Sequence, residues 1–158
     1  MIGLMSLISQ ISNKISKPII AAGGISDGRS IKAAFTLGAK GVQIGTAFIT
    51  SDESAAIPAY KEAIQNAGDC DTVLTKVFSG RWARGLKNKF ITELESSGLE
   101  ISAYPIQGSL TLPMRIEAQK QNNKEFTSLW AGQSGSKPAI KPAADIFVQL
   151  LEETNNIG

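Results

Sequence analysis

The sequence predicts an α/β fold in which two neighbouring parallel strands belong to a (β/α) barrel. Residues 18–22 and 41–44 are short apolar runs without regular polar alternation, as in parallel strands that are covered on both faces. Both runs finish in glycine, at Gly23-Gly24 and at Gly45. A helical pattern between them gives strand, helix and strand within about thirty residues, which is the length of a βαβ unit.

The length and composition are those of a globular domain. The chain has 158 residues, 42% hydrophobic and 19% charged, with a net charge of +2. These values argue against disorder and give no reason to expect nucleic acid or an anionic membrane as partner. One cysteine excludes an intrachain disulfide, and no apolar run approaches the ~20 residues of a membrane span. Without a signal-peptide pattern, a cytoplasmic protein is expected, and the sequence leaves a homo-oligomer open.

The chain contains no histidine. That absence excludes Ser-His-Asp and Cys-His nucleophiles within this chain, and it removes the commonest zinc ligand. Cys70 lies between Asp69 and Asp71, whose carboxylates disfavour a thiolate, so a reactive nucleophile is not expected there. The sequence therefore predicts no catalytic residue and no metal site.

The two glycine-ended strands predict an anion site. The carboxyl ends of adjacent parallel strands, with the amino end of the following helix, offer backbone N–H groups that suit a phosphate. Such sites recur after the last strands of (β/α) barrels. Thr46 can add a hydroxyl, and Gln43 can point the same way if its side chain faces the barrel interior. The alternative is that the glycines only form tight turns, but two glycine ends on successive strands favour the anion site.

Apolar spacing and breaker residues predict the remaining elements. Helices are expected at 4–15, 26–37, 58–67, 86–98 and 113–121, with a last one from about Pro142. An extended segment is expected at 72–78, followed by a basic, aromatic loop at 79–85. Gly108 and Pro113 are expected to break the chain into short pieces.

Several side chains have both a structural and a binding interpretation. Asp27 is predicted to cap the helix that follows it rather than to act in catalysis. Arg29 either reaches a phosphate or is solvated, and Trp130 either walls a ring-shaped ligand or belongs to the core. The basic loop either faces an anionic ligand or forms a solvated rim with Trp82 packed beneath. The cations concerned are Arg81 and Arg84 of the loop and Lys87 just after it.

Three segments resemble nitronate monooxygenase, formerly called 2-nitropropane dioxygenase: residues 18–29, 38–48 and 128–134. The first two are also similar to flavin-dependent enoyl-acyl-carrier-protein reductases and, more loosely, to inosine-monophosphate dehydrogenases. They therefore mark a phosphate-binding barrel rather than one reaction. The third segment, together with residues 81–88, favours nitronate monooxygenase. The resemblance covers essentially the whole chain but only the carboxy-terminal part of such an enzyme.

The resemblance implies a fold and a cofactor. Members are FMN-dependent TIM (β/α)₈ barrels, so about residues 1–68 are expected to supply the last two barrel strands and about residues 69–158 a helical extension that packs on the barrel. Residues 130–133 are expected near the flavin. Backbone groups that match the family's phosphate site are expected to bind FMN at Ala22, Gly23, Gly24, Gln43, Gly45 and Thr46.

The resemblance also implies an activity. The full-length parent is expected to oxidise alkyl nitronates to a carbonyl compound and nitrite with O₂. The family's base is a histidine on an earlier strand, which this chain lacks. One alternative is an enoyl-acyl-carrier-protein reductase, and another is a non-catalytic fragment that pairs with a missing half. Two strands cannot close a barrel, so the chain alone is expected to be poorly stable and to bind FMN weakly or not at all.

Overall fold

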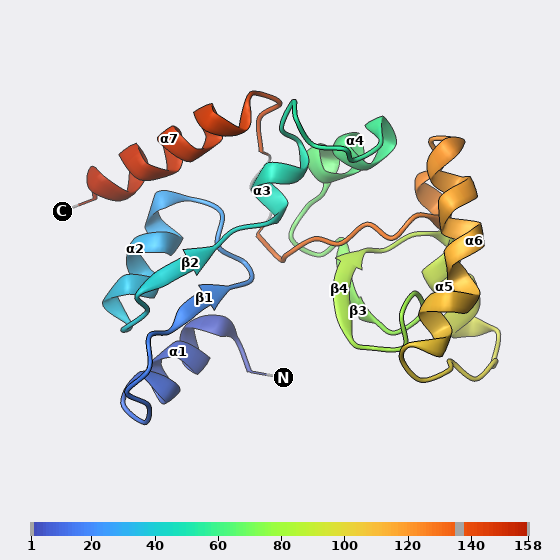
Figure 1. Cartoon of the computed structure of the whole chain (residues 1–158), viewed down its shortest axis with the longest axis horizontal. Helices are drawn as coiled ribbons and strands as arrows, with labels where there is room; N and C mark the ends of the chain where they lie inside the picture. The colour runs from blue at the N-terminus through green and yellow to red at the C-terminus, as the bar shows by residue number, and fades with distance from the viewer. Residues whose placement is uncertain (1, 135–137, 158) are drawn as a thin grey trace. The chain divides into compact units, whose positions relative to one another are not determined.

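The computed structural model describes residues 2–134 and 138–157. Over these residues the chain has a mixed α/β fold that divides into two compact units (Figure 1). The first unit contains the chain up to Ser54 and again from Gly132 onward, and the second contains Ala55–Ala131. This division differs from the boundary expected near residue 68, and the assignment of the first 68 residues to a barrel stays a prediction.

The first unit is built around a parallel pair of strands, β1 and β2 (Figure 1). Ile20 lies opposite Gly41 and Ala22 opposite Gln43, which confirms the predicted strand, helix and strand. The strands are shorter than expected, and Thr46 begins a short helix instead of ending a strand. The elements of this unit are α1 (Leu4–Ser12), β1 (Ile20–Ala22), α2 (Gly28–Thr36), β2 (Gly41–Gln43), α3 (Thr46–Ile49) and α7 (Ala143–Asn155).

Only one face of this sheet is covered. Ala21 is 1% exposed and belongs to a core that α1, α2 and α7 complete. On the other face, Ile20 is 59% exposed, and Ala22 and Gln43 are exposed beside it. The expectation that both faces are covered is therefore wrong for this chain. The buried members of the core are Ile8, Ile19, Ala21, Ile25, Ile31, Ala34, Ala39, Ala47, Ile146 and Leu150.

The second unit is built around an antiparallel pair, β3 and β4, in which Thr72 lies opposite Leu86. Its core centres on Phe78, whose ring meets those of Phe90 at 5.1 Å and Trp130 at 5.6 Å between centroids. The elements of this unit are α4 (Pro58–Asn66), β3 (Thr72–Thr75), β4 (Ala83–Leu86), α5 (Lys89–Ser96), α6 (Ile106–Lys120) and the 3₁₀ helix η1 (Lys124–Phe126).

Two predictions for this unit are wrong in their boundaries. The second half of the predicted loop at 79–85 is strand β4, which pairs with β3. The next helix begins at Lys89 instead of Leu86, because the Asn88 side chain accepts a hydrogen bond from the Ile91 amide and so caps α5. Leu86 instead ends β4 and is buried.

The predicted break at Gly108 and Pro113 is also wrong, since α6 is a single helix that contains both residues. Tertiary hydrogen bonds hold its first turns in place. The Gln107 amide donates to the Val77 carbonyl at 2.7 Å, and the Thr111 hydroxyl donates to that of Phe78 at 2.7 Å. These hydrogen bonds offset the free-energy cost of a proline inside a helix. The sequence pattern shows that cost but not the hydrogen bonds.

Candidate functional site

The carboxyl ends of β1 and β2 carry the glycines that the sequence singles out. Gly23 and Gly24 have φ angles of +109° and +71°, so this turn uses backbone conformations that other residues avoid. A Cβ atom added at Gly23 or at Gly45 would meet no heavy atom within 4 Å. The backbone at both strand ends is therefore accessible to a ligand. We call residues 22–24 together with 45–46 the glycine cup.

The cup presents several hydrogen-bond donors. Among the described residues, no acceptor is found for the amides of Gly24, Gly45 and Thr46. Thr46 lies at the start of α3, where helix amides have no intrahelical partner. Its Oγ1 accepts a hydrogen bond from the Gly132 amide at 2.9 Å. Gln43 is exposed on the uncovered face of the sheet, at the end of β2 that leads into the cup.

The amino end of α2, by contrast, is already occupied by carboxylates. Asp27 Oδ1 accepts from the Ser30 amide at 2.8 Å, and Glu153 Oε2 of α7 accepts from the Gly28 amide at 3.0 Å. Of the two helices that follow the strands, α2 therefore has capped amides, whereas α3 begins at Thr46 without a side-chain cap. Any anion at this edge has to use the cup itself.

Asp27 is the predicted helix cap. Partial burial alone would raise its pKa, but the hydrogen bonds from the Ser30 backbone and side chain, together with Arg29, lower the pKa below its usual value of 3.8. The Arg29 guanidinium lies 3.2 Å from the Asp27 carboxylate and is largely solvated. Of the two interpretations of Arg29, the structure favours the solvated one.

The basic loop has structural contacts of its own. The Arg81 guanidinium stacks on the Tyr104 ring at 3.8 Å from its centroid, and Arg84 Nη1 donates to the Thr72 carbonyl and hydroxyl at 3.2 Å each. Trp82 is 65% exposed, with the Lys76 ammonium 4.9 Å from its ring centroid. The expectation that Trp82 packs beneath the loop is therefore wrong.

Trp130 is part of the second unit's core. Its ring meets Phe78 edge-on at 82°, and its backbone bridges to Gly85. The Tyr60 hydroxyl donates to the Trp130 carbonyl, and burial raises the pKa of Tyr60 above its usual 10. The core interpretation of Trp130 is the one that these contacts support.

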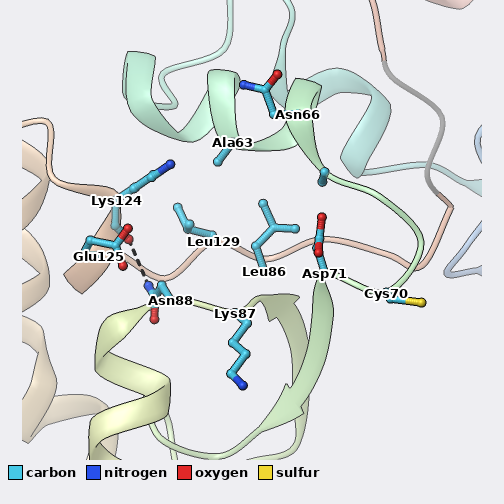
Figure 2. Close-up of a pocket in the computed structure, with 11 residues that line it drawn as sticks. Ala63, Asn66, Cys70, Asp71, Leu86, Lys87, Asn88, Lys124, Glu125 and Leu129 are labelled. Atoms are coloured by element: carbon cyan, nitrogen blue, oxygen red, sulfur yellow. Dashed lines mark hydrogen bonds between the residues drawn. The ribbon is translucent and has the colours of Figure 1, made fainter.

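A separate cleft of about 300 Å³ lies within the second unit (Figure 2). Leu86 and Leu129 form an apolar floor that points toward Ala63 of α4. The polar groups beside it have structural partners: Asp71 Oδ2 accepts from the Gly68 amide, and Asn88 Nδ2 donates to the Lys124 and Thr127 carbonyls. Cys70 on its rim is exposed.

Metal ligands and membrane spans can be assessed within residues 2–134 and 138–157. No group of three or more histidine, cysteine or acidic side chains is placed to hold a metal ion in this part of the chain. No helix among these residues is both long and apolar enough to cross a membrane.

The fold and the cup define an α/β protein with an anion-accessible edge at the carboxyl ends of two parallel strands. The family model for nitronate monooxygenase matches residues 2–153. The chain therefore belongs to the nitronate monooxygenase family, which is a family of oxidoreductases.

Similar proteins agree with this assignment. The chain is 45% identical over 157 residues to a probable nitronate monooxygenase from Staphylococcus aureus strain JH9, covering 99% of this chain and 44% of that protein. It matches a crystal structure of nitroalkane oxidase from Streptomyces ansochromogenes with a TM-score of 0.90 and 38% identity, covering 98% and 44%. It matches FabK from Thermotoga maritima with a TM-score of 0.82 and 36% identity, covering 98% and 50%. The chain thus spans under half the length of the curated relatives it matches.

Sequence reasoning expected residues 130–133 near the flavin, but it did not predict the contacts at this edge of the first unit. Gly132 and Ser134 contact the cup, and Glu153 closes the end of α2. The resemblance over residues 128–134 and the mixture of aromatic and small residues there were the signal for the first two.

Proposed function

We propose that this chain supplies the FMN phosphate-binding part of an FMN-dependent nitronate monooxygenase. The observation that carries the proposal is the glycine cup, where two positive-φ glycines and two open glycine positions end adjacent parallel strands. The strands would be the last two of a TIM (β/α)₈ barrel. The residues that would contact the phosphate are Ala22, Gly23, Gly24, Gln43, Gly45 and Thr46.

The cup fits a phosphate monoester. A phosphate accepts several hydrogen bonds at once, and the amides of Gly24, Gly45 and Thr46 have no acceptor among the described residues. The absence of side chains at Gly23 and Gly45 lets the oxygens approach the backbone. No such fit exists at the start of α2, where the Asp27 and Glu153 carboxylates already hold the amides.

The uncovered face of the β1–β2 sheet supports the view that a larger protein completes the site. A parallel sheet is normally covered on both faces, whereas Ile20 is 59% exposed here. In a complete barrel this face would line the interior, with Ala22 leaving room near the cofactor and Gln43 pointing inward. The remaining length of the relatives is enough to supply the other strands.

The chemistry would then be divided between cofactor and protein. A bound flavin would supply the transfer of electrons from a nitronate to O₂. This chain's backbone would bind and orient the phosphate, which fixes the cofactor in place. No histidine is available in this chain, so a base would have to come from the rest of the parent.

A chimera tests the proposal. The portion of the Staphylococcus aureus relative without a counterpart here is joined ahead of this chain, and the product is assayed for bound FMN and for nitrite release from a nitronate. We expect both. Gly45→Glu, which places a carboxylate in the cup, should abolish FMN retention. Gly3→Glu is the matched control, because position 3 is also open to solvent, and it should retain FMN. A folded chimera that retains no FMN contradicts the proposal.

The same chimera discriminates the alternative activities. Likeness to FabK is the observation that favours an enoyl-acyl-carrier-protein reductase as the second candidate. Oxidation of a nicotinamide donor that depends on an enoyl thioester, without nitrite release from nitronates, would support that candidate. A third possible role is a non-catalytic fragment, for which neither activity would appear. Nitronate oxidation by the chain unaided would exclude it.

A further inference from the structure

The segment from Gly132 to Ser134 contacts both halves of the glycine cup. The Gly132 amide donates to Thr46 Oγ1 at 2.9 Å, and the Ser134 hydroxyl donates to the Gly24 carbonyl. All of these residues belong to the first unit. One short segment therefore contacts the turn after β1 and the start of α3.

The contact with Thr46 determines what its hydroxyl can do. A hydroxyl has one proton and two acceptor lone pairs, and the Gly132 amide occupies one lone pair. The Thr46 proton must therefore point away from Gly132, and no acceptor for it is found among the described residues. The Gly132 amide thus keeps the Thr46 hydroxyl available as a donor.

The contact with Gly24 fixes a peptide plane. In a trans peptide the carbonyl and the N–H group point in opposite directions. Because the Gly24 carbonyl is directed at the Ser134 hydroxyl, the Ile25 N–H group points away from Ser134. Gly23 and Gly24 both have positive φ and carry no side chain that restricts them. Glycine loses more backbone freedom on ordering than any other residue. A hydrogen bond that orders this turn before a ligand arrives lowers the entropic cost of binding.

The space at position 132 favours glycine. A Cβ atom there would lie 3.2 Å from the Gly24 nitrogen and 3.7 Å from Thr46 Oγ1. Gly132 is not among the positive-φ glycines of the described residues, so the conformation itself does not require it. A methyl group would instead press on one of the amides that the cup presents.

We propose that Gly132 and Ser134 are positioning residues that preorganise the glycine cup for a phosphate monoester. The inference rests on the proposed function, because the preorganised ligand is the phosphate of FMN. Neither residue has to touch the phosphate. Their effect is on the orientation of the Gly24–Ile25 peptide and of the Thr46 hydroxyl.

Ser134→Ala tests the proposal, with Ser9→Ala as the matched control on the exposed surface of α1. The first measurement is the ¹⁵N order parameter of residues 23–26 without ligand, which reports how ordered this turn is. We expect lower order parameters in Ser134→Ala, unchanged values in Ser9→Ala and restored values in Ser134→Thr, which keeps a hydroxyl. Unchanged order parameters in Ser134→Ala overturn the proposal.

The second measurement compares FMN with riboflavin, which lacks the phosphate. We expect Ser134→Ala to weaken FMN binding by about three- to tenfold, the effect of one hydrogen bond, without changing the response to riboflavin. Gly132→Ala should weaken FMN binding at least as much. If the unsubstituted chain binds FMN and Ser134→Ala binds it equally well, positioning by Ser134 is excluded. The comparison is repeated in the chimera described above, and if the unsubstituted chimera shows no phosphate-dependent response, the proposed function itself fails.

Discussion

Each unit of this chain contains a two-stranded sheet, and the two sheets differ in how far the rest of the chain covers them. In the second unit, the antiparallel β3–β4 pair is part of a core that its own helices complete, and Asn88 is buried with partners for its side-chain groups. In the first unit, the parallel β1–β2 pair has one covered face and one bare face. The comparison indicates that the β3–β4 pair is packed within its own unit, although α6 of that unit exposes Ile106 and Leu110, whereas the bare face of β1–β2 is shaped to be completed by a ligand and by further protein.

The largest expected effect lies in the second unit. Asn88 is buried, and its side chain accepts from the Ile91 amide and donates to the Lys124 and Thr127 carbonyls. Asn88→Ala should lower the free energy of unfolding of this unit by about 3 kcal/mol, because three backbone groups, two of them in buried hydrogen bonds, lose their partners. Denaturant unfolding measures the change. Asn66→Ala, an exposed asparagine on α4, should change it by less than about 0.5 kcal/mol. Equal effects of the two substitutions would contradict the account.

Neighbouring isoleucines in the first unit test its one-sided sheet. Ile19 is 9% exposed and packs in the core, whereas Ile20 is 59% exposed. Ile19→Ala should cost about 2 kcal/mol or more in this chain, and Ile20→Ala less than about 1 kcal/mol. Thermal unfolding of both variants provides the comparison. If Ile20→Ala is as costly as Ile19→Ala, the supposedly bare face is covered in solution.

The packing of α7 on α2 requires a glycine. A Cβ atom at Gly28 would lie 2.4 Å from the Glu153 backbone carbon. Gly28→Ala should therefore destabilise the first unit by about 1–3 kcal/mol and increase hydrogen exchange in α7. Gly108→Ala is the control in α6, where the added methyl meets nothing within 4 Å and should stabilise the helix by about 0.5–1 kcal/mol. A stable Gly28→Ala variant with α7 still protected would refute this packing.

The smallest effect concerns pH. The pKa of Asp27 is lowered in the folded chain, so its contribution to stability is present above the unfolded value of about 3.8 and is lost as the pH falls through the folded value. Replacing this cap with alanine should cost about 1 kcal/mol near neutral pH. Asp27→Asn keeps an acceptor oxygen but does not titrate. Unfolding curves between about pH 5 and pH 3 should be less pH-dependent for Asp27→Asn than for the unsubstituted chain. If both proteins show the same pH dependence, titration of Asp27 does not contribute to the pH dependence of stability.

Local sequence patterns predicted the parts of the fold that local physics determines. Apolar runs that end in glycine predict the two strands and the helix between them. A capping residue a few positions after the first glycines predicts the start of that helix at Asp27. The continuity of α6 could not be predicted in this way. It depends on Gln107 and Thr111 bonding to Val77 and Phe78, about thirty residues earlier.

The candidate site shows the same division. Its glycines were visible in the sequence because each stands at the end of an apolar run. The contacts that hold it were not, because the Gly132–Thr46 and Ser134–Gly24 hydrogen bonds join positions that are 86 and 110 residues apart. No periodicity or spacing rule links such positions, so the structure was needed to find them.

The central proposal is that the glycine cup of this chain binds the phosphate of a flavin. Titration of the ¹⁵N-labelled chain with FMN and with riboflavin, followed by NMR, tests it most directly. The account predicts weak binding of FMN that shifts the amides of Gly23, Gly24, Gly45 and Thr46 and is competed by inorganic phosphate, with no such shifts from riboflavin. Equal shifts from both compounds, or none from FMN, would contradict it.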